Sequence, residues 1–322
     1  RSILALMQEA LSVAVLVPTF RRAAALERCL AGLAAQTRRP DRVLVVTRPD
    51  DEAAHRVIDA APAALTVERV SVGQPGQVAA LNAGLDAFRD EVVAIIDDDC
   101  VPRPDWLERI TARFAADPAL DGLGGPDRLV QGGVRVTGER RRVGRVFWYG
   151  RFLGQHHLGA GAASEVDFLK GANMSYRRSA IAGQRFDPHL RGTGAQPHND
   201  WAFSLGIRAA GRRLVFDPAI VVDHYEAARA KDNPRLAFDP LASDSYMYNQ
   251  TYLAALYLRP ARLRAHLVYS MLVGTKAAPG VVMTLYGFAT RREPARDTLR
   301  RWTGARRARG AALRTAAQVR RT

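Results

Sequence analysis

The chain has 322 residues, of which 48% are hydrophobic, and a formal net charge of +15 at pH 7. That length allows one large domain or two smaller ones with a substantial core. The charge is uneven: residues 291–322 hold eleven arginines and two acidic residues, a net +9, so residues 1–290 carry only +6. Aromatic residues are not interleaved with these arginines as stacking platforms, and no nucleic-acid-binding motif accompanies them, which argues against a nucleic-acid partner.

Residues 12–99 alternate apolar, β-branched runs with segments of helical periodicity. We expect strands at residues 12–17, 42–46, 65–70 and 92–96, and helices at residues 22–36, 50–60 and 78–88. Strands that alternate with helices form parallel sheets covered by helices, and near-continuous apolar strands indicate burial on both faces. The pattern predicts an α/β fold with a mostly parallel central sheet flanked by helices.

Three consecutive aspartates, Asp97, Asp98 and Asp99, follow the predicted strand at residues 92–96. This is the carboxyl edge of the sheet, where ligands bind in open α/β folds. Repulsion and partial burial would raise the pKa values of such carboxylates unless a cation compensates. Their oxygen atoms suit Mg²⁺ or Mn²⁺, and Mg²⁺ is commonly held by carboxylates together with substrate phosphates. The triplet predicts a metal-bridged phosphate ligand; the alternative is a solvated acidic turn.

Regular alternation weakens beyond the triplet. We expect a helix at residues 105–116, a glycine-rich turn at 122–126 and an irregular segment at 127–165 that forms a mobile lid over a site. Order returns with a segment at 168–176, a helix at 200–210 and strands at 213–216 and 219–224. These elements would complete one domain over residues 1–226.

Residues 227–322 are expected to form a helical extension. Within it, residues 265–290 are apolar but divided by Lys276 and by Pro279-Gly280, so each piece is too short to span a bilayer. The two pieces would lie in a membrane interface or pack on the domain as ordinary helices. The basic tail at residues 291–322 would bind an anionic membrane surface or be merely solvated.

The two cysteines, Cys29 and Cys100, form neither a metal-binding spacing nor a disulfide framework. The first ten residues lack the apolar core of a cleavable signal peptide. We therefore expect a cytoplasmic protein that associates peripherally with the inner face of the membrane.

Several short motifs in a fixed order carry a family resemblance. They are Val-Pro-Thr-Phe at residues 17–20 with Arg22, Gly-Gln-Val-Ala-Ala-Leu-Asn-Ala-Gly at 76–84, the aspartates at 97–99, Gly-Ala-Asn-Met at 171–174, Asn-Asp-Trp at 199–201 and Asp-His at 223–224. Over residues 12–226 the chain resembles the inverting family-2 glycosyltransferases of the GT-A fold. The resemblance implies that fold, a nucleotide-diphosphate sugar as donor, and a divalent metal, Mn²⁺ or Mg²⁺, that bridges the pyrophosphate.

The resemblance also implies roles for the acidic motif. Asp99 would bind the metal and Asp97 would contact the nucleotide, with Asp98 beside it. His224 matches a position where related enzymes often place another metal ligand; a structural histidine is the alternative. A metal on both phosphates would neutralise the charge that builds on the leaving diphosphate.

Three matching positions, Pro18, Thr19 and Arg22, would line the nucleotide-binding site. After the second strand, family members typically carry Asp-Asp-Gly-Ser, whereas this chain has Thr-Arg-Pro-Asp-Asp at residues 47–51. Asp50 would reach the polar edge of the base or cap the following helix.

Other matching positions have structural alternatives. Asn82 and Gly84 would approach the nucleotide, although Gly84 would equally allow tight helix packing. Asn173 would lie near the sugar and acceptor, or hold a turn. Four further residues would form a sugar platform or a small core beneath the irregular segment: Trp148, Tyr149, His156 and His157.

Inversion requires a base that takes the proton of the acceptor hydroxyl. Asp200 is our candidate, at a position where family members usually carry Glu-Asp ahead of a helix; here Asn199 replaces the first acid. Asp200 would also serve as a helix N-cap, and His198 is the second candidate base.

The leading hypothesis is a metal-dependent inverting glycosyltransferase with a glycan, lipid-linked or small-molecule acceptor. A sugar nucleotidyltransferase is less favoured, because it would need a glycine-rich phosphate loop after the first strand. The non-enzymatic alternative is a glycosyltransferase-like module that binds a nucleotide or partner without turnover.

Overall fold

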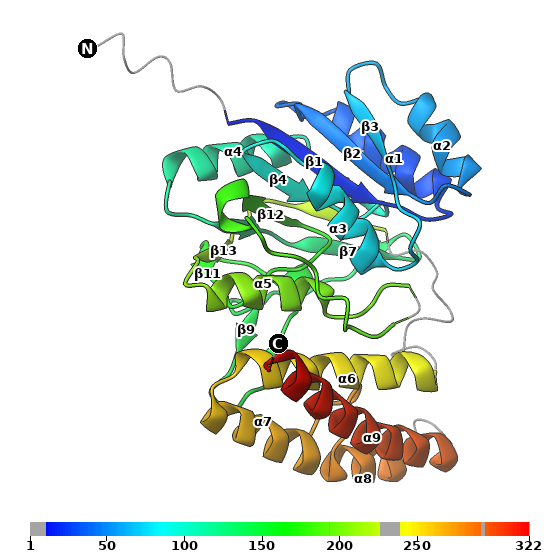
Figure 1. The fold of residues 1–322 in the computed structure, drawn as a ribbon, viewed down its shortest axis with the longest axis vertical. Helices are drawn as coiled ribbons and strands as arrows, with labels where there is room; N and C mark the ends of the chain where they lie inside the picture. The colour runs from blue at the N-terminus through cyan, green and yellow to red at the C-terminus, as the bar shows by residue number, and fades with distance from the viewer. Residues whose placement is uncertain (1–10, 193, 226–238, 291–293, 322) are drawn as a thin grey trace.

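The computed structural model describes residues 11–192, 194–225, 239–290 and 294–321 (Figure 1). Its largest sheet has eight strands in the order β11-β13-β6-β12-β4-β1-β2-β3. The four predicted N-terminal strands are present and pair in parallel: β1 (Val13–Pro18), β2 (Arg42–Thr47), β3 (Val67–Ser71) and β4 (Val92–Ile95). The predicted α/β fold with a large, helix-flanked central sheet is confirmed.

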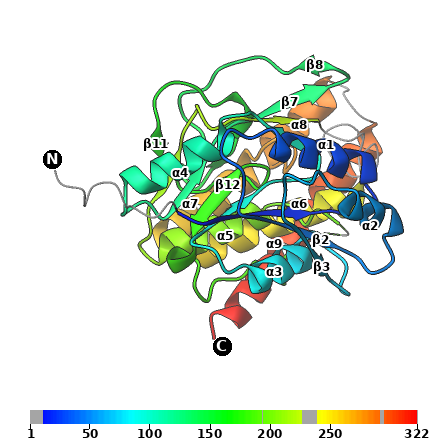
Figure 2. The ribbon, with the colours of Figure 1, turned by 90° about the horizontal axis from the view of Figure 1, so that it is seen from above.

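Both faces of this sheet are buried, because alternate residues of β1 belong to two different cores. Val13, Val15 and Val17 pack in the core that contains the apolar face of α1 (Ala23–Ala34). Ala14 and Leu16 pack in the other core, with α3 (Gln77–Ala87). Figure 2 shows α1 and α4 (Trp106–Ala116) on one side of the sheet and α3 on the other. A shorter helix, α2 (Glu52–Asp59), follows β2.

The predicted glycine-rich turn at residues 122–126 is wrong, because β6 (Gly122–Gly124) is a buried strand of the central sheet. It pairs antiparallel with β12 (Met174–Arg177) and parallel with β13 (Leu214–Phe216). A Cβ at Gly122 would lie 2.5 Å from Leu214 and 2.8 Å from Tyr176. Glycine is present because neighbouring side chains approach the backbone closely. The short strand β11 (Ser164–Glu165) forms the sheet edge.

A second sheet has the order β5-β14-β7-β8 and lies beyond the end of β4. Its strands are β5 (Cys100–Pro102), β7 (Asp127–Gln131), β8 (Val134–Arg135) and β14 (Val222–His224). Strand β14 pairs antiparallel with β5 and parallel with β7, so His224 lies opposite both Cys100 and Leu129. This pairing brings His224 next to the aspartate triplet.

The segment expected to be an irregular lid is partly regular. Besides β7 and β8, it contains the antiparallel pair β9 (Arg145–Val146) and β10 (Phe152–Leu153) and the turn η2 (His156–Leu158). Phe152 and His156 are buried within it. A further short turn, η3 (Arg178–Ala180), follows β12, and α5 (Asn199–Ala209) precedes β13.

Four helices follow at the end of the molecule opposite α2 and β3 (Figure 1): α6 (Pro240–Tyr257), α7 (Pro260–Leu272), α8 (Val281–Thr290) and α9 (Ala295–Val319). The stripe of small residues on α9, made of Ala305, Ala308, Ala312 and Ala316, is buried in the same core as α6. The basic tail is thus a packed helix over its described residues, while most of its arginines, such as Arg300, Arg306 and Arg307, remain exposed. Within the described ranges, no helix is long and apolar enough to cross a membrane.

Candidate active site

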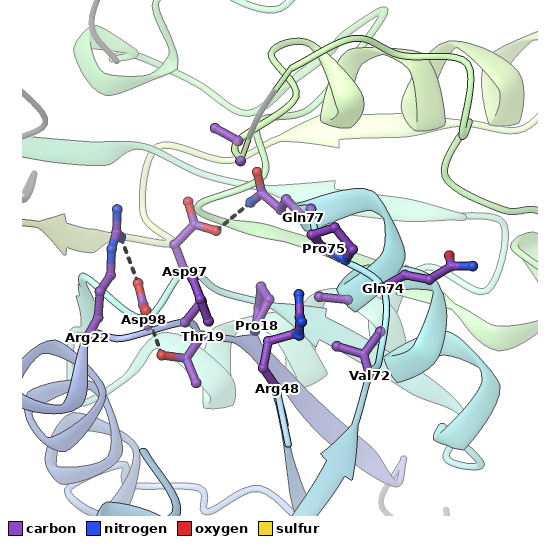
Figure 3. A pocket seen from close by; sticks show the side chains of 15 residues that line it. Pro18, Thr19, Arg22, Arg48, Val72, Gln74, Pro75, Gln77, Asp97 and Asp98 are labelled. Atoms are coloured by element: carbon purple, nitrogen blue, oxygen red, sulfur yellow. Dashed lines mark hydrogen bonds and ion pairs between the residues drawn. The ribbon is translucent and has the colours of Figure 1, made fainter. Parts of the chain in front are cut away.

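The aspartate triplet begins two residues after Ile95, the last residue of β4, and two of its side chains are buried. Asp98 Oδ2 accepts a hydrogen bond from Thr19 Oγ1 at 2.8 Å, and Asp98 Oδ1 lies 3.0 Å from Arg22 Nη1 (Figure 3). Arg22 Nη1 also donates to Asp99 Oδ2 at 2.9 Å. Burial raises the pKa of Asp98, whereas Arg22 and Thr19 oppose that rise. The side chain of Arg22 therefore supplies one counter-charge that the triplet requires.

A pocket opens beside Asp97. Gln77 Nε2 donates to Asp97 Oδ1 at 3.3 Å, and Asn199 Nδ2 donates to Gln77 Oε1 at 3.1 Å. These bonds tie the triplet to the N-terminal ends of α3 and α5. Five predicted residues line the pocket together: Pro18, Thr19, Arg22, Asp97 and Asp98.

The opposite wall of the pocket contains residues to which our sequence analysis assigned no role. Arg48 and Gln74 follow β2 and β3, and their side chains flank the pocket in Figure 3. The guanidinium of Arg48 lies 5.9 Å from the ring centre of Phe20, which also lines the pocket. Because β1, β2 and β3 are parallel, the residues after each strand meet at one edge. Applied to the residue that follows β2, this rule would have identified Arg48 as a pocket residue.

A chain of charged groups leads from Asp99 into the second sheet. His224 Nε2 lies 3.2 Å from Asp99 Oδ1, and His224 Nδ1 lies 3.2 Å from Asp127 Oδ2. Lys170 Nζ also contacts Asp127. Burial opposes the charge on His224, but Asp127 and Asp99 outweigh it and raise the pKa of His224 to about 9.

Asp127 is fully buried. Burial by itself would raise its pKa, but Lys170 and His224 hold that pKa well below its usual range, so the carboxylate stays ionised. An ionised carboxylate on Nδ1 fixes the orientation of the imidazole, as the carboxylate partners of metal-binding histidines do. The sequence alone does not predict this group of contacts, because its members are far apart along the chain: Asp127, Lys170 and His224.

Asp200 lies in the first turn of α5. Its Oδ2 accepts a hydrogen bond from the backbone N–H of Gly171 at 2.9 Å, and its Oδ1 accepts one from the N–H of Trp201 at 2.9 Å. Burial raises the pKa of Asp200, although these N–H groups and Lys170 oppose the rise. The N-cap residue of α5 is His198 and not Asp200, because the helix begins at Asn199, before the predicted cap.

His198, the second candidate base, is buried between aromatic rings. Its ring centre lies 4.3 Å from those of both Trp201 and Tyr246. The backbone of His198 has a left-handed φ of 69°. This packing favours a structural role for His198 over proton transfer.

A model of the family described as glycosyltransferase like family 2 matches residues 10–237. The chain belongs to this family. A curated relative, glycosyltransferase AglE from Haloferax volcanii, is 28% identical over 117 residues, which cover 35% of this chain and 38% of the relative. That match spans well under half the length of either protein.

Two solved glycosyltransferase structures share the GT-A fold of this family-2 chain. Mannosyltransferase PcManGT from Pyrobaculum calidifontis, in complex with GDP-Man and Mn²⁺, has a TM-score of 0.58 and 21% identity, with coverage of 96% of this chain and 87% of that chain. GalNAc-T7 with UDP, GalNAc and Mn²⁺ has a TM-score of 0.63 and 10% identity, with coverage of 91% and 56%. At these identities the likeness establishes the fold alone.

Two predicted ligand contacts are not supported. The amide of Asn82 pairs with the backbone of Phe186 at 2.8 and 2.9 Å, outside the pocket. Asn173 is 1% exposed; its Oδ1 accepts from Trp106 Nε1, and its Nδ2 donates to the carbonyl groups of Pro126 and Ile220. Both amides hold chain segments together. For Asn173 this agrees with the alternative that it holds a turn.

Other predicted positions also lie away from the pocket. Asp50 is absent from its lining; its carboxylate lies 3.4 Å from Arg21 and 3.8 Å from Arg48. A Cβ at Gly84 would lie 2.2 Å from Leu16, so helix packing explains that glycine. The proposed aromatic platform is not assembled, because Trp148 is 78% exposed whereas His156 is buried.

Proposed function

We propose that this protein transfers a glycosyl group, with inversion, from a nucleotide-diphosphate sugar to a hydroxyl group of a glycan, lipid-linked or small-molecule acceptor. One observation carries the proposal. Asp97 and Asp98 line the pocket, and the next residue, Asp99, pairs with His224. A nucleotide in the pocket would place its diphosphate towards this cluster. Both structural neighbours were solved with a nucleotide or nucleotide sugar and Mn²⁺, which supports the proposal.

Asp99 and His224 would hold a divalent metal, Mn²⁺ or Mg²⁺. Their potential ligand atoms, together with the thiol of Cys100, lie within 4.8 Å of one another. Cys100 is a poor candidate because burial raises its pKa well above the usual value and keeps the thiol protonated. Cation binding would displace the proton held between His224 and Asp99. When bound, the metal would neutralise charge on the leaving diphosphate.

Asp200 would act as the general base. Its carboxylate would take the proton of the acceptor hydroxyl as the acceptor oxygen attacks the anomeric carbon. The bond from that carbon to the diphosphate oxygen would break on the opposite face, which inverts the configuration. The raised pKa of Asp200 suits this role, because a base works best when its pKa approaches the working pH.

A thermal-shift screen of UDP-, GDP- and dTDP-sugars, with and without Mn²⁺, tests donor binding. A donor that binds only the folded chain raises the melting temperature, and we expect the shift to require the cation. Release of nucleoside diphosphate from that donor would support transfer. Binding without release, for a range of acceptors, would favour the non-catalytic module.

A further inference from the structure

Helix α8 exposes an unusually apolar surface. Its ten residues, Val281–Thr290, include no charged side chain, and only Thr284 is buried. Apolar helices in globular proteins normally turn that surface towards a core. Leu285 is 61% exposed and Val282 is 53% exposed. Helix α8 therefore presents its apolar side chains to the surroundings and not to the interior.

Helix α7 extends the same surface. Val268, Met271 and Leu272 are each about half exposed and recur at helical spacing along α7. The helices are joined by a tight turn in which the N–H of Gly280 donates to the carbonyl of Val273 at 3.1 Å. We call these exposed side chains the α7–α8 patch: Val268, Met271, Leu272, Val273, Val281, Val282, Leu285, Tyr286 and Phe288. Exposed apolar side chains gathered on two neighbouring helices are typical of interaction sites.

The chain segment that contains the patch carries charge of one sign. Residues 245–292 contain six lysine and arginine residues and no aspartate or glutamate. Arg264 and Lys276 are exposed on α7 and in the turn. Long basic side chains can cover apolar surface with their stems while their charges meet anions. The surroundings of the patch therefore complement a negatively charged surface.

An exposed tryptophan is held beside α7. Trp148 is 78% exposed, and its neighbour Tyr149 packs edge-on against Tyr269 of α7, with ring centres 5.2 Å apart. The loop is also held by hydrogen bonds from Arg262 to the carbonyl groups of Val146 and Phe147. Tryptophan is enriched where proteins meet the headgroup region of a bilayer.

We propose that the α7–α8 patch, with Trp148, docks on the surface of an anionic lipid bilayer. Apolar residues, basic residues and an exposed tryptophan together are the features of helices that lie in the plane of a membrane interface. A symmetric contact between two copies would place the same basic residues against each other, which disfavours a second copy as the occupant. The contact belongs to α7 and α8, which contain most of the apolar residues 265–290 for which a membrane interface was one of two sequence-based alternatives, and not to the basic tail.

Co-sedimentation of the full chain with vesicles tests the proposal. We expect binding to phosphatidylcholine vesicles that contain phosphatidylglycerol, weaker binding without it, and weakening by salt. The double variant Leu272→Glu/Leu285→Glu should bind at least about tenfold less, because it removes apolar burial and adds repulsion. Both side chains are more than half exposed, and an unchanged melting temperature would show that the variant folds.

Val134→Glu is the matched control, because Val134 is 71% exposed on β8, outside the patch; it should bind as the original chain does. Trp148→Phe should remove the vesicle-induced blue shift of tryptophan fluorescence. The proposal is overturned if the original chain does not bind anionic vesicles or if the double variant binds them equally well. Dimers that the double variant dissociates, without vesicle binding, would identify a second copy as the occupant and also overturn it.

Discussion

At the scale of single residues, the acidic triplet depends on partners from three other segments. Arg22 comes from the N-terminal end of α1, Gln77 from α3 and His224 from β14, and each contacts one or two of the aspartates. The three carboxylates consequently have different environments. Asp97 lies at the pocket, Asp98 is anchored by Thr19 and Arg22, and Asp99 faces His224. Our proposed division of roles follows these environments.

Asp99→Asn should remove metal-dependent donor binding. The amide keeps the size of the side chain but loses the charge that a divalent cation requires. We expect donor affinity in the presence of Mn²⁺ to fall at least about tenfold, a loss of about 1.4 kcal/mol, as measured by calorimetry. Asp50→Asn, an exposed site outside the pocket, is the matched control. Unchanged affinity in Asp99→Asn would contradict the metal assignment.

Asp200→Asn should separate catalysis from binding. The amide oxygen can still accept the hydrogen bond from Gly171, so the N-terminal end of α5 should keep its structure. Donor affinity should be unchanged, while transfer should slow by about 10² to 10⁴ because proton transfer is lost. Steady-state kinetics with donor affinity measured in parallel provide the check. Near-normal turnover would direct attention to His198.

At the scale of elements, α9 shows how an arginine-rich sequence forms a packed helix. Its buried alanines allow close approach to α6, and a Cβ on Gly304 would lie only 2.3 Å from Asp244 Oδ1. Two arginines, Arg301 and Arg309, are also buried, and Arg309 donates to the carbonyl groups of Ala278 and Pro279. Burial lowers the pKa of Arg309 to about 10. The small residues on one face, more than the charge, explain the position of this helix.

Ala312→Leu should destabilise the protein, because Ala312 is fully buried on the packed face of α9. Overpacking of this kind costs about 1–3 kcal/mol. Ala317→Leu introduces the same side chain at an exposed position of the same helix and should leave stability nearly unchanged. Denaturant unfolding of both variants measures the difference. Equal stabilities would mean that the α9 face is loosely packed.

At the scale of the whole molecule, buried histidines make stability depend on pH. His156 is 1% exposed, and burial lowers its pKa from 6.5 to about 4. Between these pH values the unfolded chain binds a proton at this site and the folded chain does not. Stability therefore falls as the pH falls through this window, by about 3 kcal/mol from His156.

His156→Gln should remove that component of the pH dependence, while glutamine can still donate to the carbonyl of Phe168, as His156 Nε2 does at 3.1 Å. Unfolding free energies measured at several pH values between 4 and 6.5 should fall less steeply in the variant than in the original chain. His189→Gln, at a side chain that is half exposed, controls for the loss of a histidine. Parallel pH profiles for the original chain and His156→Gln would contradict the prediction.

The sequence determined the features that depend on local periodicity and order. Alternating apolar strands and helices predicted the parallel sheet, and the position of Asp97 just beyond the end of β4 followed from that pattern. Pro18 and Thr19, which the family resemblance assigned to the nucleotide site, line the pocket at the end of β1. These predictions succeeded because strand direction and helix periodicity are encoded within short segments.

Only the tertiary structure decided which polar groups the fold itself uses. It showed that Asn82 and Asn173 hold backbone segments together, that Asp127 orients His224, and that Gly122 belongs to a strand. Each depends on contacts between residues distant in sequence. Local patterns show which groups can form hydrogen bonds and ion pairs, but long-range packing determines which partners they meet. The acidic triplet was evident from the sequence, whereas its counter-charges required the fold.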